Sequence, residues 1–133
     1  MNHYKDELGY VGYDSKDDYT FMEFARNVET DGFIKLHEKV VDMLKSMSTY
    51  SGKHLVDTSR IKTISLEGQA WVVENVVPLI QKKSRSDKAL IAVVLSKDVF
   101  GKFAAENISR KTNEISDTVF FKSHEDALAF LLK

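Results

Sequence analysis

The sequence predicts a single α/β domain, built on a mixed β-sheet with an N-terminal hairpin and about four helices packed on it. Three observations predict this fold class. Short runs of β-forming residues alternate with longer segments whose apolar residues recur every three or four positions. The run at 89–95 is apolar throughout, as in a central strand covered on both faces. No repeat or linker divides the chain, so residues 1–133 are expected to form one domain.

The N-terminal part predicts an antiparallel hairpin. Residues 8–13 and 19–26 are rich in aromatic and β-branched residues, and the segment 15–18 between them has the composition of a turn. Gly9 and Gly12 indicate a bulge or an edge position in the first strand.

A first helix is expected to follow, with Thr30 or Asp31 as its N-cap. Its apolar residues lie on one helical face and are Phe33, Leu36, Val40, Leu44 and Met47. A short strand at 54–57 comes next.

Ser65 is expected to cap a second helix. The core-facing stripe predicted for this helix consists of Leu66, Ala70, Val73, Val77 and Ile80. Pro78 removes one helical hydrogen bond, so the helix should kink or end nearby.

The last third of the chain predicts the central strand at 89–95, a helix from about Asp98, a short strand at 118–121 and a final helix capped by Ser123. Strands that alternate with helices imply crossover connections, so the sheet should be parallel in its later part.

Three blocks give the sequence a resemblance to a known family. They are residues 54–58 with 64–71, residues 89–95 with 96–102, and residues 119–121 with the apolar helix after Glu125. In order and spacing they resemble the SpoIIAA-like branch of the STAS family, the domain of bacterial anti-sigma-factor antagonists. The resemblance implies a mixed sheet with helices, related to STAS and SEC14 domains. It also implies a non-enzymatic regulatory or protein-interaction module.

One family feature is missing. Antagonists of this fold carry an Asp-Ser-Ser-Gly turn at the start of a helix, and a kinase phosphorylates the first serine. The corresponding residues here are 65–68, and Leu66 stands where the family has its phosphorylated serine. A leucine cannot accept phosphate, so this switch is not expected to operate.

The amino-acid composition argues against several classes of function. Nineteen basic and twenty acidic residues leave a net charge of −1, which gives no general attraction to nucleic acid. The sequence has no cysteine, which excludes disulfides and thiolate chemistry. It shows no signal peptide and no apolar run long enough to span a membrane, so a cytoplasmic protein is expected.

We identify no catalytic, cofactor-binding or metal-binding constellation in the sequence. The four histidines are scattered without ligand spacing, and no phosphate-binding loop or nucleophile elbow is present. Asp57 ends a strand and Ser65 begins a helix, so each is a candidate for binding a ligand or for capping a turn.

Trp71 lies outside the predicted core stripe of the second helix, and Val72 and Val76 extend apolar surface beside it. These three residues predict an interface, and the expected assembly is a homodimer. The predicted function is a non-enzymatic interaction module with an unidentified protein partner. The alternative is a carrier of an apolar small molecule or lipid, and a carrier would need an internal cavity of several hundred Å³.

Overall fold

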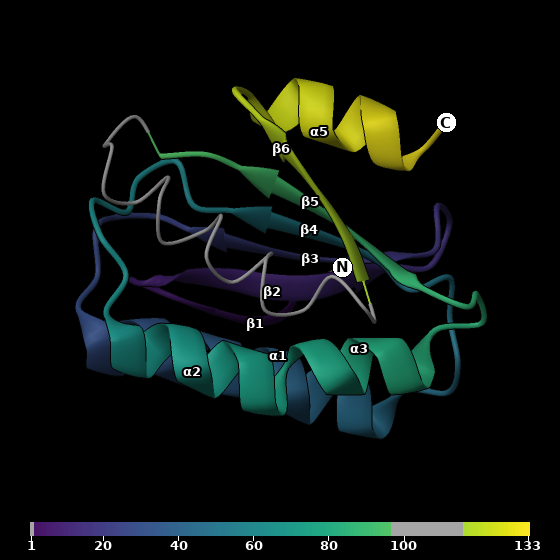
Figure 1. Ribbon diagram of the computed structural model, residues 1–133, viewed down its shortest axis with the longest axis horizontal. Coiled ribbons are helices and arrows are strands. Elements are labelled where there is room, and N and C mark those ends of the chain that lie inside the picture. The colour runs from purple at the N-terminus through teal and green to yellow at the C-terminus, as the bar shows by residue number, and fades with distance from the viewer. Residues whose placement is uncertain (1, 97–115) are drawn as a thin grey trace.

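The computed structural model describes residues 2–96 and 116–133, and the strands in these residues form one six-stranded sheet (Figure 1). The strands are β1 (Asn2–Asp6), β2 (Gly9–Asp14), β3 (Tyr19–Phe24), β4 (Lys53–Asp57), β5 (Ala89–Val94) and β6 (Ser116–Phe121). The helices in the same residues are α1 (Thr30–Ser46), α2 (Leu66–Asn75), α3 (Val77–Lys83) and α5 (His124–Leu131). The order of the strands across the sheet is the same as their order in the chain.

The sheet is mixed, as the sequence predicted. Strands β1, β2 and β3 pair antiparallel, whereas β3 to β6 are parallel. The predicted hairpin is formed by β2 and β3. The first strand, β1, was not predicted, because Tyr4 is its single large apolar residue and the strand has no alternating pattern. It lies at the edge of the sheet and pairs with β2 alone.

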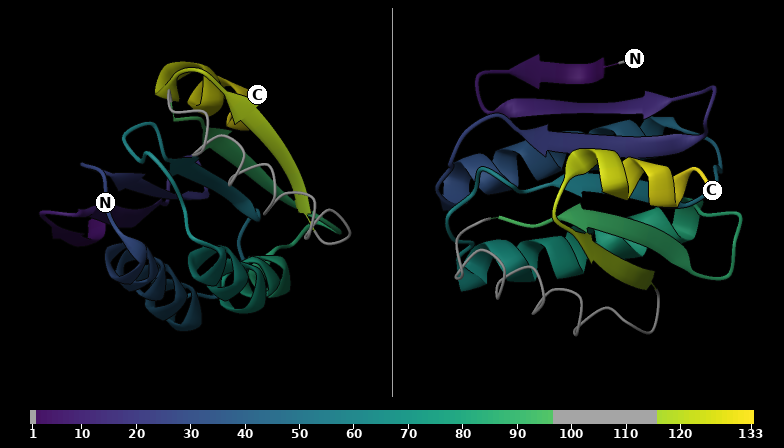
Figure 2. Two further views of the ribbon diagram at one scale, coloured as in Figure 1. Left: turned by 60° about the vertical axis from the view of Figure 1, so that its left-hand side comes forward. Right: turned by 90° about the horizontal axis from the view of Figure 1, so that it is seen from above.

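The helices cover the two faces of the sheet unequally. Helices α1, α2 and α3 cover one face along its length, and α5 lies on the other (Figures 1 and 2). Helix α5 lies mainly over β4, β5 and β6, and it does not extend over β1 and β2. The larger apolar core lies under α1 to α3. A smaller core lies under α5 and consists of Tyr19, Leu55, Ala92, Val94, Ala127 and Leu131.

Two of the three predicted helix caps are found in the structure. The Ser65 Oγ accepts a hydrogen bond from the Gly68 backbone N–H at 3.0 Å, and Ser123 caps α5 in the same way through Asp126. The prediction for α1 was wrong. Its N-cap is Glu29, which makes no side-chain cap. The Thr30 hydroxyl instead donates to the Ser65 Oγ at 2.7 Å, so it links the starts of α1 and α2.

The core-facing stripe predicted for the second helix was right for Val77 and Ile80, which are buried in α3, and wrong at the start of α2. Leu66 is 75% exposed, and Ala70 is exposed as well. The buried residues of α2 are Gly68, Gln69 and Val72. Gly68 faces the core because it lies against the ring of Phe33, where a Cβ would come within 3.0 Å of the ring. Gln69 is buried because its side chain donates to the Ile64 carbonyl at 3.0 Å.

Pro78 marks the helix break that the sequence predicted. Helix α2 ends at Asn75, and α3 begins at Val77 with the proline in its first turn. Helix α3 continues in the direction of α2 (Figure 1), so α2 and α3 together lie on the sheet like one bent helix beside α1. The helix expected from about Asp98 lies outside the described residues. None of the described helices has the length and apolar character needed to cross a membrane.

Candidate functional site

The candidate site lies at the edge of the sheet where the parallel strands end. Strands β3, β4, β5 and β6 share one direction, so their carboxyl ends meet at this edge. Helices α1, α2 and α5 begin beside it. In open sheets of this kind ligands gather outside the carboxyl ends of the strands.

Asp57, the last residue of β4, is one of the predicted candidates. Both oxygens of its carboxylate have partners in the structure. The Oδ1 atom accepts hydrogen bonds from the Ser59 backbone N–H at 2.9 Å and from the Ser59 hydroxyl at 2.6 Å. This is the turn-capping role that the sequence suggested. Asp57 shares the α5 side of β4 with Leu55, because alternate residues of a strand point to the same face. Its Oδ2 atom therefore faces α5.

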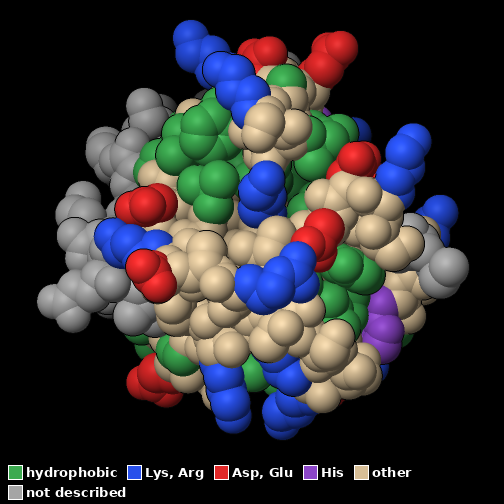
Figure 3. All heavy atoms as spheres, turned by 90° about the vertical axis from the view of Figure 1, so that its right-hand side faces the viewer, with side chains coloured by type: hydrophobic (Ala, Val, Ile, Leu, Met, Phe, Trp, Pro, Cys, Tyr) green, Lys and Arg blue, Asp and Glu red, His purple; other side chains and the backbone are tan. Residues whose placement is uncertain are grey.

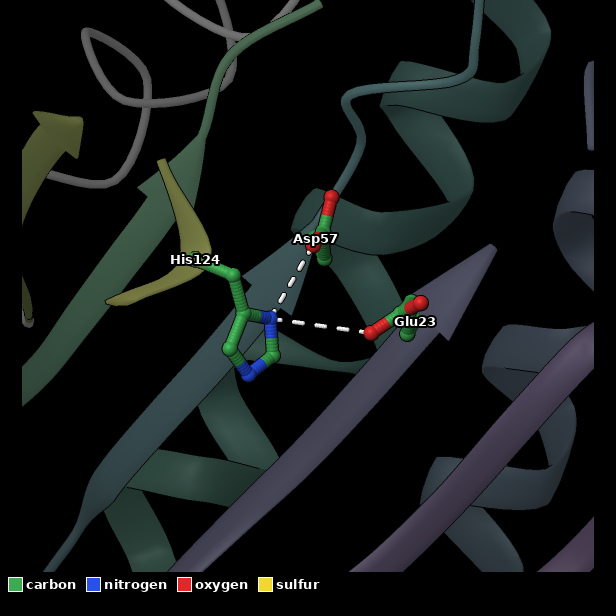
Figure 4. A group of neighbouring side chains, drawn as sticks. All are labelled: Glu23, Asp57 and His124. Carbon is green, nitrogen blue, oxygen red and sulfur yellow. Dashed lines mark hydrogen bonds and ion pairs between the residues drawn. The ribbon is translucent and has the colours of Figure 1, made fainter. Parts of the chain in front are cut away.

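His124 and Glu23 complete a cluster that the sequence did not reveal (Figure 4). The His124 Nδ1 atom lies 3.0 Å from Asp57 Oδ2 and 3.6 Å from Glu23 Oε1. Among the residues that the structure describes, these three form the histidine and carboxylate group whose ligand atoms all lie within 4.8 Å of one another. The side chains of Asp57 and Glu23 are 5% and 20% exposed, and that of His124 is 41% exposed.

Neighbouring donors hold the Glu23 carboxylate in place. The Tyr10 hydroxyl donates to Oε1 at 2.7 Å, and Arg60 donates to Oε2 at 3.1 Å. Burial and the hydrogen bond to Glu23 raise the pKa of Tyr10 to about 12. Tyr10 therefore keeps its proton and stays a donor to Glu23 at neutral pH.

A second feature of this edge is an open groove between the starts of α1 and α2, on the other side of the sheet. Its volume is about 480 Å³. It is lined by Asn27, Val28, Glu29, Thr30, Asp31, Phe33, Thr63, Ile64 and Ser65. The Ser65 Oγ already accepts hydrogen bonds from Gly68 and Thr30, which use both of its lone pairs. Ser65 thus acts as a cap and a link between two helices.

The structure corrects the predicted interface on α2. Val72 and Val76 are 6% and 2% exposed and belong to the larger core, so they offer no surface to a partner. Trp71 is partly buried and packs against the same core. The interface prediction was therefore wrong for Val72 and Val76, because both lie on the core side of the helix. An interface role for Trp71 stays a prediction.

Two histidines lie in the larger core, beside a small cavity. The His37 Nδ1–H donates a hydrogen bond to the Phe33 carbonyl at 2.9 Å, and the His54 Nδ1 atom forms one at 2.8 Å with the Thr20 hydroxyl. Among the described residues, His54 Nε2 has no hydrogen-bond partner. The cavity that both rings line has a volume of about 60 Å³ and is otherwise mainly apolar. That volume is far below the several hundred Å³ of a typical small-molecule pocket.

The basic stretch between α3 and β5 makes no cationic patch. Lys88 pairs with Asp117 at 3.1 Å, Arg85 pairs with Asp18, and the Lys83 ammonium donates to the Met47 carbonyl. Figure 3, which views this end of the molecule, shows basic and acidic side chains interspersed. On this face, the described residues therefore form no patch of single-sign charge of the kind that attracts a nucleic-acid backbone.

Comparison with known proteins identifies the fold. No protein-family model matches the sequence, and no curated protein matches it. The structure is similar to the crystal structure of an uncharacterised protein of the DUF3478 family, with a SpoIIAA-like fold, from Shewanella loihica PV-4. The two share 18% sequence identity with a TM-score of 0.61, over 96% of this chain and 98% of the other. The chain therefore has a SpoIIAA-like fold, as the sequence resemblance implied.

Proposed function

We propose that this protein is a non-enzymatic module that binds a protein partner at the groove between the starts of α1 and α2. The observation that carries the proposal is the exposure of Leu66, the first residue of α2. Its side chain is 75% exposed, the highest value among the large apolar residues in the described part of the chain. It follows Ser65 of the groove directly.

A single exposed leucine is common on protein surfaces, so the exposure of Leu66 supports a binding site only together with its surroundings. Leu66 makes no contribution to the core, while the groove beside it provides a concave surface of about 480 Å³. Apolar side chains at the edge of a concave surface are typical anchors for a partner. This is also the position at which the resembling antagonists carry their regulatory serine.

The charge of the groove indicates the kind of partner. Glu29 and Asp31 line it and are exposed, and Glu67 follows Leu66. None of the three carboxylates forms an ion pair with another described residue. Complementarity favours a partner segment that carries lysine or arginine next to an apolar side chain.

Two observations support a role without catalysis. The Thr20 hydroxyl lies 2.8 Å from a nitrogen of His54, but both residues are fully buried and out of reach of a substrate. His124 is exposed, but the Ser59 hydroxyl points to Asp57 and not to the ring. Neither arrangement offers an activated nucleophile to solvent.

The proposal predicts that Leu66→Ser weakens partner binding about tenfold, because losing the burial of a leucine side chain costs about 1.5 kcal/mol. Wild-type and variant chains would be immobilised and used to capture proteins from an extract of the source cells, with quantification by mass spectrometry. Binding of each enriched protein would then be measured with purified components by calorimetry.

The matched control is Leu132→Ser, because Leu132 is the other exposed large apolar residue in the described chain, at 38%, and directly follows α5. The supporting result is a partner that binds wild type and Leu132→Ser with equal affinity. The same partner should bind Leu66→Ser poorly, and it should also bind the Glu29→Lys, Asp31→Lys double variant poorly. A partner that binds Leu66→Ser as tightly as wild type contradicts the proposal.

A further inference from the structure

Glu23 and Asp57 place two carboxylates side by side on neighbouring strands. They are register partners across the parallel pair β3 and β4, and both point to the α5 face. Like charges directly opposite each other destabilise a sheet, more so where the groups are shielded from water. With Asp57 at 5% and Glu23 at 20% exposure, a cation between their oxygens would reduce this repulsion.

The His124 ring supplies a nitrogen at that point. Figure 4 shows Nδ1 directed between the two carboxylates, and the distances to Asp57 Oδ2 and Glu23 Oε1 are 3.0 and 3.6 Å. In a metal site with bonds of about 2.1 Å, neighbouring ligand atoms lie about 3.0 to 3.5 Å apart. The two distances from Nδ1 are therefore close to those between ligands around one cation, and the two carboxylate oxygens lie within 4.8 Å of each other.

The atoms behind these ligands are fixed. Ser59 holds the far oxygen of Asp57 with two hydrogen bonds, and Tyr10 and Arg60 orient the Glu23 carboxylate. His124 is the first residue of α5, whose start is capped by Ser123. Partners of this kind orient ligands in established metal sites. The 41% exposure of His124 leaves a route for an ion and room for bound water.

We propose that Glu23, Asp57 and His124 form a binding site for a divalent first-row transition-metal ion such as Zn²⁺ or Mn²⁺. His124 binds through Nδ1 with its proton on Nε2, and each carboxylate binds through one oxygen. The imidazole nitrogen favours these ions over Mg²⁺ and Ca²⁺, which take oxygen ligands. Three protein ligands leave at least one position for water. Without metal, the Nδ1–H of the same ring donates to Asp57.

Two positive groups near the cluster lower its affinity for a metal ion. Arg60 lies 3.1 Å from Glu23 Oε2, but its side chain is 53% exposed and therefore screened by solvent. The start of α5 carries the positive end of the helix dipole, which Glu125 and Asp126 in the first turn offset. We expect micromolar binding, with Zn²⁺ bound more tightly than Mn²⁺ in line with the usual order of divalent metals.

The test is calorimetric titration of the full chain with ZnCl₂ after treatment with EDTA and dialysis. One ion should bind per chain, and His124→Gln should weaken binding at least tenfold. Co²⁺ should give visible absorption bands with wild type that His124→Gln lacks. The matched control is His3→Gln, because His3 is an exposed histidine outside the cluster.

The results distinguish a specific metal site at the three residues from nonspecific binding of metal to the surface. Glu23→Gln should also lose affinity, and its thermal midpoint without metal shows whether the variant is folded. No saturable binding of one ion by wild type contradicts the proposal. It is also contradicted if His124→Gln binds Zn²⁺ like wild type, or if His3→Gln loses the binding.

Discussion

At the scale of single residues, His37 and His54 are ionisable groups held neutral inside the larger core. Burial lowers the pKa of His37 to about 4, and burial together with the nearby His37 lowers the pKa of His54 to about 3. In the unfolded chain both have pKa values of about 6.5. The unfolded chain therefore binds protons that the folded protein does not bind between pH 6.5 and about 4.

This difference predicts that stability is fully present above pH 6.5 and is lost as the pH falls below it. In that window each histidine lowers the free energy of unfolding by about 1 kcal/mol per pH unit, so the two together cost about 2 kcal/mol between pH 6 and pH 5. Urea unfolding at pH 7, 6 and 5 measures the slope. His54→Asn should flatten it, whereas His3→Gln should leave it unchanged; an unchanged slope in His54→Asn would refute the assignment.

The sequence predicted the role of a residue correctly where that role depends on its neighbours in the chain. The caps Ser65 and Ser123 follow from residue type and position. The Glu23, Asp57 and His124 cluster joins residues 34 and 67 positions apart in the chain, counted as 57 − 23 and 124 − 57. One signal was present in the sequence: each residue lies at or just after the end of a strand in the parallel set.

At the scale of elements, α2 shows why apolar spacing alone can place a helix face wrongly. Leu66, Ala70 and Val73 form a regular stripe, yet the buried side includes Gly68 and Gln69. A glycine allows close contact with Phe33, and a glutamine satisfied by a backbone carbonyl can lie in the core. Neither contact has a signature in a hydrophobicity pattern.

The corrected face predicts what Trp71 contributes. Trp71→Ala should lower the free energy of unfolding by about 2 kcal/mol, less than for a fully buried tryptophan, because the ring is partly buried against the larger core. Urea unfolding gives the stability and light scattering gives the mass. Glu74→Ala, an exposed change on the same helix, should cost under about 0.5 kcal/mol. A Trp71→Ala variant of unchanged stability and halved mass would show an interface instead.

At the scale of the whole molecule, the cavity that the described residues enclose in the larger core is small. It lies beside His37 and His54 and has a volume of about 60 Å³, while an acyl chain needs several hundred. This cavity is therefore too small to hold an acyl chain.

This packing predicts that a fluorescent fatty acid does not bind with micromolar affinity. Fluorescence titration with the full chain measures it, and a fatty-acid carrier in the same assay shows that the probe is competent. Saturable binding of one fatty acid per chain would favour the carrier function over the interaction module.

The mixed sheet, its hairpin and its later parallel strands could be predicted because alternating apolar runs and helical stripes depend on short stretches of sequence. The edge strand β1 could not, because a strand with one partner and polar residues needs no apolar alternation.

The agreement between strand order and chain order has a consequence for how the protein is made. None of the six described strands has to insert between two others that are already paired, because each adds to the edge formed by the described strand before it. A chain that emerges from the ribosome from its N-terminus can therefore assemble these strands in the order of synthesis. When β6 emerges, the β5 edge is already available to pair with it. Domains of this topology are suited to folding during translation.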